Sequence, residues 1–381
     1  MSISTLSEIV ESWGGLIQTG PFGSQLHQHD YSEQGIPVVM PKDIRNGRVD
    51  ECGIARISEG KASQLSRHFL KAGSVVFPRR GEISKCAYID EEQAGFLCGT
   101  GCIKIEPPEE KLRSKFLFYF LGLRQSVEWL ERNAVGTTML NLNTKILGGL
   151  KVPLFAPKKQ DEIVEILSAY DDLIENNRRR IQLLEQAARL LYKEWFVHLR
   201  FPGHEHTQII DGVPEGWRKK PLGTFAPLKY GKALKNDDRV PGPFPVYGSS
   251  GIVGIHTKAF VLGPTIIVGR KGNVGSVYWS PDDCHPIDTV YYIDSGNCSF
   301  FLYYALQQMT FISTDVAVPG LNRDFAHSRL MLVAEQKILR LFEETVSPLH
   351  QQTELLKRQN ASLAKARDLL LPKLMNGEVA V

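Results

Sequence analysis

Two short basic turns of the sequence carry residue types that could bind nucleic acid. Arginine can contact a phosphate or read guanine through two hydrogen bonds, and the asparagine amide suits adenine. In FPRRGEISK and VGRKGNVG such side chains surround Gly81 and Gly272, which let the backbone turn sharply or approach a ligand closely. A single basic turn usually only faces solvent. Because the pattern recurs at the same place in the sequence, DNA binding and a solvated loop are equally well supported interpretations. The candidate DNA-binding residues are Arg79, Arg80 and Lys85 in the first copy, which are expected to correspond in that order to Arg270, Lys271 and Asn273 in the second.

The sequence contains none of the motifs that bind a nucleotide or build a common hydrolytic site. There is no GxxxxGK[ST] phosphate loop, and the glycines of GRKGNVG and GSSGIVG lack GxGxxG spacing. Neither HExxH nor GxSxG occurs, and the Asn/Asp-Pro-Pro-aromatic tetrapeptide typical of amino-methyltransferases is missing. We therefore expect no catalytic residues and no cofactor in this chain, and no enzymatic activity of its own.

Histidine and cysteine pairs are present, but their spacing does not predict a metal site. Cys98 and Cys102 form a CxxxC pair, and HxH pairs begin at His27 and His204. A zinc site needs about four convergent ligands, and none of these pairs has a second pair nearby. We expect buried cysteines, solvated histidines and no bound metal. The acidic turn at Asp282 is expected to be only a polar turn, because no nucleophile or metal accompanies it.

The composition is that of an ordinary folded protein. The chain has 381 residues, of which 43% are hydrophobic and 23% charged, and a formal net charge of +3. This length predicts roughly two or three domains, and the charge permits an anionic partner without requiring one. No apolar run reaches the roughly 18 residues of a membrane span, and the N-terminal segment does not resemble a secretion signal. Six scattered cysteines do not form a disulfide framework, so we expect a cytoplasmic protein.

The chain repeats itself, and the repeat predicts its architecture. IQTGPFGSQL is answered by LKYGKAL, and GIPVV by PFPVY. Further along, FPRRGEIS pairs with VGRKGNVG, KFLFYFL with FFLYYAL, and AVGTTMLNLN with AVPGLNRD. No single match is persuasive, but all occur in the same order. Short apolar runs with Gly and Pro, and one short aromatic-rich helix in each copy, predict an α+β fold with two copies of one mixed α/β domain.

A long helix with a coiled-coil period follows each copy. Its stripe residues alternate in steps of four and three, which gives a narrow, largely apolar stripe about 50 Å long. We expect the two stripes to pack together in an antiparallel coiled coil with one domain at each end, in a pseudo-twofold arrangement. The first stripe is Ile163, Leu167, Tyr170, Ile174, Asn177, Ile181, Leu184, Ala188, Leu191 and Trp195. The second stripe is Ile338, Phe342, Thr345, Leu349, Gln352, Leu356, Gln359, Leu363, Ala366 and Leu370.

The expected domain boundaries follow from these patterns. The first domain covers residues 1–150 and the first long helix 151–199. The linker and second domain cover residues 200–330, and the second long helix covers 331–381. The segment HLRFPGHEHTQIIDGVPEGW has two Pro-containing turns and no helical period, so it is expected to carry the chain into the second copy.

Several residues of the long helices interrupt or flank the stripes. Asn177, Gln352 and Gln359 either fix the register of the coiled coil or lie on a partly exposed edge. Pro348 should kink the second helix or remove one of its hydrogen bonds. The candidate residues for docking of partner proteins are Arg178, Arg179, Arg180, Leu190, Trp195 and Phe196.

The combination of these features resembles a known family. Two variable domains closed by long helices, with GPFGSQL, GIPVV, LNLNTKILGGLKVPLF, QDEIVEIL and ARDLLLPKLMNGEV, look like the specificity subunit of type I restriction-modification systems. The resemblance covers essentially the whole chain, and residues 141–167 and 366–379 are its most specific parts. The second copy has LMLVAEQ where the first has VPLFAP, a departure that concerns the packing of that junction.

The resemblance implies a non-catalytic subunit that reads DNA. Each domain would be a target recognition domain for one half of a bipartite sequence in double-stranded DNA, and the helices would set the spacing and dock two methyltransferase subunits. Those subunits would use S-adenosylmethionine to methylate adenine, and motor-nuclease subunits, with ATP and Mg²⁺, could join to translocate and cut DNA. The alternatives are a coiled-coil scaffold for other proteins, which salt-dependent DNA binding would exclude, and a divergent DNA-modifying enzyme, which an acidic cluster would favour.

Overall fold

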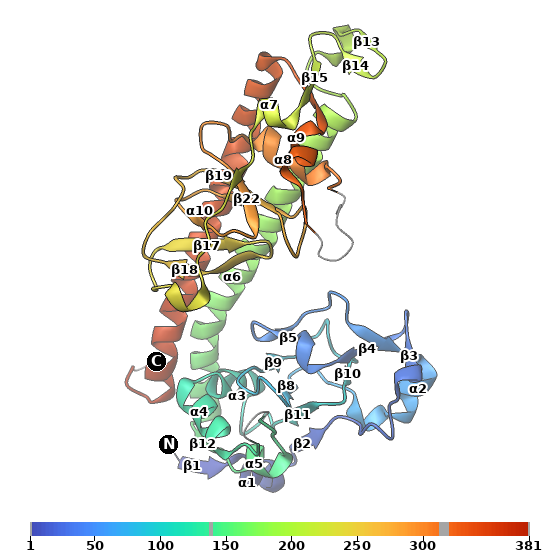
Figure 1. Cartoon of the computed structure of the whole chain (residues 1–381). Helices are drawn as coiled ribbons and strands as arrows, with labels where there is room; N and C mark the ends of the chain where they lie inside the picture. The colour runs from blue at the N-terminus through green and yellow to red at the C-terminus, as the bar shows by residue number, and fades with distance from the viewer. Residues whose placement is uncertain (1, 137–139, 312–319, 380–381) are drawn as a thin grey trace. The chain divides into compact units, whose positions relative to one another are not determined.

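The chain folds into two compact units, each built around part of both long helices (Figure 1). The structure is a computed structural model that describes residues 2–136, 140–311 and 320–379. Unit 1 is formed by Met1–Glu175 and Gln359–Val381, and unit 2 by Asn176–Arg358. The last pair of matched segments from the sequence comparison lies partly outside the described residues.

Unit 1 combines two four-stranded sheets with short helices. One sheet has the strand order β2-β11-β8-β9 and the other the order β10-β4-β7-β3. Its short helices are α1 (Leu6–Trp13), α2 (Glu59–Gln64), α3 (Ser114–Leu121), α4 (Arg124–Asn133) and α5 (Thr144–Gly148). Its strands are β1 (Ser2–Thr5), β2 (Leu16–Thr19), β3 (Tyr31–Ser32), β4 (Ile36–Val39), β5 (Ile44–Arg45), β6 (Arg48–Val49), β7 (Ala55–Ile57), β8 (Val75–Pro78), β9 (Ala87–Tyr88), β10 (Leu97–Cys98), β11 (Cys102–Glu106) and β12 (Lys151–Leu154).

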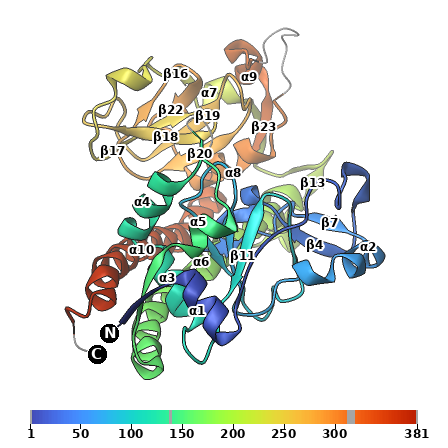
Figure 2. The same cartoon turned by 90° about the horizontal axis from the view of Figure 1, so that it is seen from below.

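The two sheets of unit 1 pack into different apolar clusters. The sheet that contains β4 and β7 packs against α2, through a cluster that includes Val38, Ile57 and Ala62. The aromatic helix α3 instead lies beside the long helices, where Phe116 belongs to the same core as Ile163 (Figure 2). The α3 helix and the sheet β2-β11-β8-β9 therefore form the layer that joins the domain to its helices.

Unit 2 repeats this plan with fewer elements. One sheet has the strand order β16-β22-β19-β20, and a three-stranded sheet has the order β18-β17-β21. Its short helices are α7 (Leu222–Phe225), α8 (Phe300–Gln308) and α9 (Arg323–Ser328). Its strands are β13 (Ile209–Ile210), β14 (Val213–Pro214), β15 (Arg218–Pro221), β16 (Lys229–Tyr230), β17 (Phe244–Gly248), β18 (Gly251–His256), β19 (Thr265–Gly269), β20 (Val277–Ser280), β21 (His285–Pro286), β22 (Val290–Ile293) and β23 (Leu330–Val333).

The sheets of the two units have the same connectivity. The order β2-β11-β8-β9 of unit 1 becomes β16-β22-β19-β20 in unit 2, with antiparallel pairing throughout. In the second sheet, β10 runs parallel to β4 and β4 antiparallel to β7, just as β21 runs parallel to β17 and β17 antiparallel to β18. The expectation of an α+β fold with two copies of one mixed domain is confirmed.

A pair of strands closes each copy where it meets the long helices. In unit 1, β1 pairs with β12 so that Ser2 lies opposite Leu154, and in unit 2, β15 pairs with β23 so that Arg218 lies opposite Val333. Each copy therefore begins and ends at the same place on its unit.

Matching helix caps precede the closing strands. The side chain of Asn143 accepts a hydrogen bond from Ile146 N at the start of α5, and Asn322 accepts one from Phe325 N at the start of α9. Both are N-cap residues that satisfy a free backbone donor of the first turn. Asn143 and Asn322 are therefore equivalent residues of the repeat.

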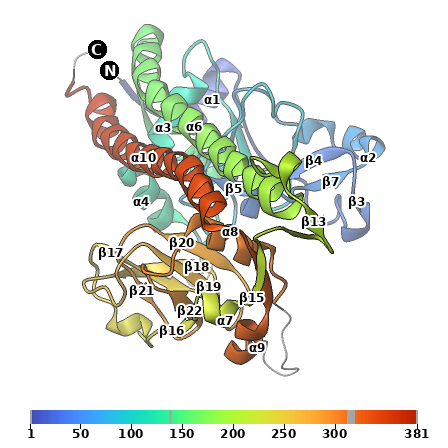
Figure 3. The ribbon, with the colours of Figure 1, turned by 90° about the horizontal axis from the view of Figure 1, so that it is seen from above.

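The long helices α6 (Pro157–Tyr192) and α10 (Gln336–Met375) pack against each other (Figure 3). In unit 1 the early residue Ile163 of α6 shares a core with the late residue Leu374 of α10. In unit 2 the late residue Tyr192 of α6 shares a core with the early residue Phe342 of α10. The two helices therefore run antiparallel, as the sequence predicts.

The apolar stripe of α6 is predicted correctly, but that of α10 is shifted at alternate positions. All ten predicted positions from Ile163 to Trp195 are buried or half-buried. In the second stripe Thr345 and Gln359 are exposed, and Val346 is buried in place of Thr345. The buried and half-buried stripe of α10 matches that of α6 residue by residue when the two are offset by the separation between Asn143 and Asn322. A heptad pattern alone does not fix which of two adjacent residues faces the partner, because both lie near the seam.

The polar residues of the stripes behave differently from one another. Asn177 is only 8% exposed, whereas Gln359 lies on the surface. The side chain next to Gln359, Asn360, donates from Nδ2 to the backbone oxygen of Ile174 at 3.2 Å. Asn360 therefore joins the two helices within unit 1. The α10 helix continues through Pro348, whose side chain is exposed.

Two further features of the described residues bear on the sequence predictions. The linker contains a short β-hairpin, β13–β14, whose turn residues Asp211 and Gly212 have φ angles of 50° and 73°. Positive φ at both central residues is the geometry of the tight hairpin turns favoured by Asp-Gly. No helix in the described ranges is both long and apolar enough to cross a membrane.

Candidate nucleic-acid interface

Arg79 and Arg270 occupy the same position in the two units. Each directly follows a strand of its sheet, Arg79 after β8 and Arg270 after β19. The backbone N of Arg79 donates to Gly101 O at 2.6 Å, and that of Arg270 donates to Thr289 O at 2.9 Å. Their carbonyl oxygens accept from Leu142 N and Leu321 N, both at 2.8 Å. The backbone is therefore held on both sides at each arginine.

The glycine of each basic turn has the left-handed conformation that its position requires. Gly81 has φ 82° and Gly272 has φ 79°, a region that glycine enters without steric cost. The next residue but one donates its backbone N to the glycine oxygen at 3.0 Å in both turns. The two turns therefore have the same shape, and each carries an exposed basic residue, Arg80 in unit 1 and Lys271 in unit 2.

The third pairing of the sequence comparison, Lys85 with Asn273, is wrong. Once Gly81 is aligned with Gly272, Asn273 stands where unit 1 has Glu82. Lys85 lies further along the turn, where its Nζ pairs with Glu82 Oε2 at 2.6 Å. Both Lys85 and Asn273 are exposed, but they do not form an equivalent pair.

A glycine that precedes each basic turn in the chain packs against the neighbouring loop. A Cβ atom on Gly20 would lie 2.0 Å from Gly99 O, and one on Gly231 would lie 2.1 Å from Ile287 O. No other residue fits such an approach, because carbon and oxygen cannot come so close. The matched segments GPFGSQL and YGKAL are therefore fixed beside the loops that hold the two arginines, since Gly101 and Thr289 follow directly in those loops.

In unit 1 the arginine lies over an aromatic residue of this glycine segment. The guanidinium carbon of Arg79 is 5.9 Å from the centroid of the Phe22 ring, and Phe22 is 54% exposed. The Nε atom of Arg79 is buried and has no hydrogen-bond partner among the described residues. The Arg79 side chain is half-buried, and the attraction between a guanidinium and an aromatic face favours its position near the Phe22 ring.

In unit 2 the arginine lies among several aromatic and basic side chains. The guanidinium carbon of Arg270 is 5.0 Å from the Tyr230 ring centroid and 5.7 Å from that of Tyr291. A second arginine, Arg323, lies 5.1 Å from the same Tyr230 ring. Sequence reasoning missed Phe22, Tyr230 and Arg323. A usable signal was present for the first two, because each lies beside the matched glycine of its segment.

Known proteins match this chain over most of its length. A family model described as the type I restriction modification DNA specificity domain matches residues 3–186. The MjaIX type I restriction enzyme specificity subunit of Methanocaldococcus jannaschii is 24% identical over an alignment that covers 92% of this chain and 88% of that protein. The HindI specificity subunit of Haemophilus influenzae is 22% identical, with coverage of 88% and 93%.

A solved structure shares the fold. The type I restriction-modification S subunit from Mycoplasma genitalium superposes with a TM-score of 0.58 at 20% identity, over 98% of this chain and 95% of that one. Over nearly all of its length the chain is similar to type I restriction-modification specificity subunits. Arg79 lies within the residues that match the specificity domain.

The residues expected to dock partner proteins divide into two groups. Arg178, Arg179 and Arg180 are exposed on α6, and Leu190 is 60% exposed. Two of the expected residues do not offer the predicted apolar surface, because they are 8% and 7% exposed in the core of unit 2. These two are Trp195 and Phe196.

The end of α6 explains this correction. Residues Lys193–Val197 form one π-helical turn, so the surface expected for a regular helix does not continue there. The Phe196 ring lies 4.7 Å from Phe301 and 5.0 Å from Phe342, centroid to centroid. Trp195 packs on the same Phe342 ring at 5.7 Å. Both side chains therefore stabilise the junction between the helix and unit 2.

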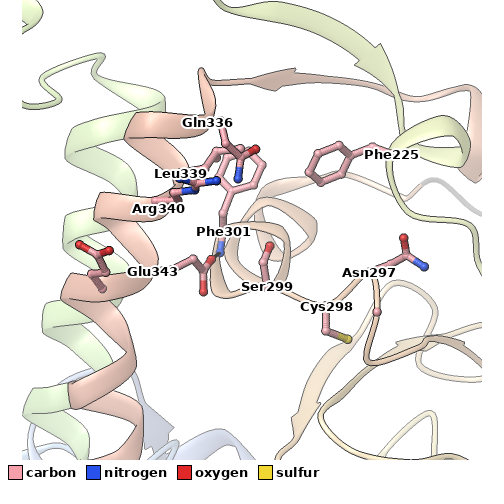
Figure 4. A pocket seen from close by; sticks show the side chains of 11 residues that line it. Phe225, Asn297, Cys298, Ser299, Phe301, Gln336, Leu339, Arg340 and Glu343 are labelled. Atoms are coloured by element: carbon pink, nitrogen blue, oxygen red, sulfur yellow. Dashed lines mark hydrogen bonds between the residues drawn. The ribbon is translucent and has the colours of Figure 1, made fainter.

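A cavity of about 510 Å³ lies in unit 2 between the start of α8 and the start of α10 (Figure 4). Cys298 and Glu343 are its chemically distinctive residues. Burial raises the pKa of the Cys298 thiol to about 12, and its Sγ donates to Ile293 O. Burial also raises the pKa of Glu343, although its carboxylate accepts hydrogen bonds from Phe300 N and Phe301 N. A protonated thiol and a carboxylate engaged by the backbone are not a nucleophile and base in position.

The cysteines and acidic residues elsewhere do not converge either. Cys98 and Cys102 are fully buried in one apolar cluster, as the sequence predicts, and burial raises both pKa values. Asp283 accepts a hydrogen bond from Gly263 N and so stabilises a turn. Among the residues that the structure describes, no group of three or more His, Cys, Asp or Glu side chains could hold a metal ion.

Proposed function

We propose that this chain is a type I specificity subunit that recognises a bipartite sequence in double-stranded DNA, with one half read by each unit. The observation that carries the proposal is the equivalence of the turns at Arg79 and Arg270, each fixed by the same backbone hydrogen bonds and each beside an exposed aromatic ring. Fixed arginines suit readout of base edges, while the exposed Arg80 and Lys271 suit phosphate contacts.

The long helices are proposed to set the distance between the two readers and to dock two methyltransferase subunits. Those subunits would bind S-adenosylmethionine and methylate adenine, and motor-nuclease subunits using ATP and Mg²⁺ would cut DNA in a complete complex. The exposed arginines of α6 and Leu190 remain the docking candidates. This chain would recognise and assemble in the cytoplasm without catalysing, so the lone chain would neither methylate nor cleave DNA.

Methylation mapping tests this proposal directly. The chain is expressed with its methyltransferase partner, and methylated adenines are located in the host DNA. We expect two short specific half-sites with a fixed gap, their centres about 10 base pairs apart, because we propose that both readers contact one side of the duplex. The double variant Arg79→Ala, Arg80→Ala should lose sequence preference in one half-site only.

An exposed arginine away from the turn provides the control. Arg124→Ala removes a side chain on α4 that is 92% exposed, and it should leave the methylated sequence unchanged. Methylation that does not depend on this chain would refute the proposal. So would a turn variant that weakens both half-sites equally.

A further inference from the structure

Two arginines of unit 2 lie close to one exposed aromatic ring. Tyr230, at the end of edge strand β16, is 48% exposed. The guanidinium carbons of Arg270 and Arg323 lie 5.0 Å and 5.1 Å from its ring centroid. Attraction between a guanidinium and an aromatic face holds each cation near the ring, but the two cations repel each other. A cluster of this kind favours an anionic ligand with planar groups, which is the chemistry of a nucleic acid.

Arg270 is the more restrained of the two arginines. Its Nη1 donates to the backbone oxygen of Asp288 at 3.1 Å, and its guanidinium also lies 5.7 Å from the Tyr291 ring. Tyr291 is in turn fixed, because its hydroxyl donates to Leu321 O at 2.8 Å. A planar fork held in one orientation loses little entropy on binding, so it suits a contact that must distinguish one base from another.

Arg323 is less restrained and more accessible. It is the first residue of α9, directly after the cap Asn322, and its side chain is 42% exposed. Its Nε atom is buried without a hydrogen-bond partner in the described part of the chain, and Asp324 approaches only to 3.8 Å. Such an exposed ion pair contributes little, so the charge of Arg323 is free to meet a phosphate.

The cluster is not required by the fold, because unit 1 lacks it. Aligning Gly20 with Gly231 places Thr19 where unit 2 has Tyr230. Aligning the caps Asn143 and Asn322 places Thr144 where unit 2 has Arg323. The same backbone therefore forms with and without these side chains, which assigns them to what unit 2 binds.

We propose that Arg270, Tyr230 and Arg323 are specificity-determining residues of unit 2. Arg270 reads a guanine through two hydrogen bonds, Tyr230 holds it in the reading orientation, and Arg323 contacts the neighbouring phosphate. This inference rests on the proposed function, since it names the base and the backbone contacts within one half-site. The half-site read by unit 2 then contains a G·C pair at the position of Arg270.

Binding measurements with base substitutions test these roles. The complex of the chain with its methyltransferase is titrated with target duplexes in which each pair of the second half-site is replaced, at several salt concentrations. Arg270→Ala should reduce discrimination at one G·C pair by about 10- to 100-fold. Arg323→Ala should weaken all sequences alike and lower the salt slope by about one, as a phosphate contact does.

Further variants separate reading from folding. Arg270→Lys keeps the charge but not the planar fork, so it should lose the same discrimination while the protein stays folded. Tyr230→Ala should partly relax discrimination at that pair, and Tyr230→Phe, which keeps the ring, should not. The exposed Arg218→Ala on β15 is the matched control and should leave discrimination unchanged.

The outcomes distinguish this inference from the proposed function. If the unaltered complex binds all duplexes alike, the proposed function fails. If it is specific but Arg270→Lys keeps full discrimination at every G·C pair, only the roles assigned to these three side chains are wrong. The same conclusion follows if Arg323→Ala changes the preferred base rather than the salt slope.

Discussion

In both units the aromatic helix is joined to a long helix at equivalent positions, but the tyrosine meets a different partner group in each unit. In unit 1, Tyr119 of α3 donates to Asp171 of α6 at 2.6 Å, and Arg367 of α10 donates to the same carboxylate. In unit 2, Tyr304 of α8 meets Nε2 of His350 on α10 at 2.9 Å. The positions of Asp171 and His350 are equivalent in the repeat. The repeat therefore preserves the tyrosine and its target position, while the partner group changes from a carboxylate to an imidazole.

A second contact at the start of the aromatic helix also differs between the units, although Gln160 and Glu343 do not occupy equivalent positions of the repeat. The fully buried amide of Gln160 accepts from Arg113 N just before α3 and donates to the backbone oxygens of Lys111 and Phe155. In unit 2 the carboxylate of Glu343 accepts from two backbone donors at the start of α8. An amide can both donate and accept, whereas a carboxylate only accepts. The two side chains therefore match different backbone surroundings and should not be interchangeable.

Exchanging these two side chains should give the largest effect. Gln160→Glu would place a carboxylate against two carbonyl oxygens in a dry site, and we expect unit 1 to lose about 3 to 5 kcal/mol. Glu343→Gln keeps an acceptor and removes a buried charge, so unit 2 should change by less than about 1 kcal/mol. Hydrogen exchange of α3 and α8, followed by mass spectrometry, measures each unit separately.

The pH dependence of the first variant is its control. A protonated carboxyl group can donate, so the loss caused by Gln160→Glu should become smaller as the pH is lowered. Equal losses in the two units, or a loss that does not depend on pH, would contradict the distinction between the amide and carboxylate contacts.

The imidazole of unit 2 should make that unit sensitive to mild acid. Burial and, secondly, Lys357 lower the pKa of His350 from 6.5 to about 4, and its ring stacks on Phe300 at 3.9 Å. Below pH 6.5 the unfolded chain binds a proton that the folded unit does not accept until about pH 4. Stability therefore falls as pH decreases through this window, by up to about 3 kcal/mol.

The matched variant for this prediction is His350→Gln, which retains polar atoms but does not titrate. Urea unfolding at pH 7 and pH 4.5, followed by tryptophan fluorescence of Trp279 near this histidine, compares the two proteins. Other histidines with lowered pKa values, His68, His285 and His327, contribute equally to both proteins. An unchanged pH dependence in the variant would show that His350 is not responsible.

The tyrosine hydroxyls should have the smallest effects. Tyr119→Phe removes one hydrogen bond but leaves Asp171 paired with Arg367, so we expect a loss of about 1 kcal/mol. Tyr304→Phe leaves the buried imidazole without its hydroxyl partner and should cost somewhat more, about 2 kcal/mol. A double-mutant cycle of Tyr119→Phe with Asp171→Asn measures the coupling in unit 1, and additive losses would mean that the contact is not a tether.

Sequence patterns predicted those parts of the fold that depend on residues close together in the chain. Heptad spacing identified both long helices, and the glycine beside basic residues identified the turns at Arg79 and Arg270. The α10 stripe was misplaced by one residue at Thr345 because spacing alone allows either neighbour to face the partner. The burial of Phe196, which lies outside the predicted stripe, was missed because a π-helical turn ends the regular period.

The remaining site residues become neighbours only through the tertiary fold. Tyr230 reaches Arg270 because β16 pairs with β22, and β22 pairs in turn with β19, the strand before the arginine. Arg323 arrives from far along the sequence, next to the bridge between Lys271 and Gly320. No spacing rule links these three side chains. The sequence therefore predicted the turn at Arg270 but not the positions of Tyr230 and Arg323 beside it.

The paired closing strands give the domain of each unit fixed ends. Ser2 lies opposite Leu154, and Arg218 lies opposite Val333. The segment between the two paired strands of each copy therefore starts and ends at neighbouring points. Unit 1 has extra elements such as α2 between its closing strands, yet it ends on the same ladder as the shorter second copy. A domain with different loops and a different internal length could therefore be transplanted between the same two strands. Under the proposed function, such an exchange would give the protein a new DNA target while the long helices stay unchanged.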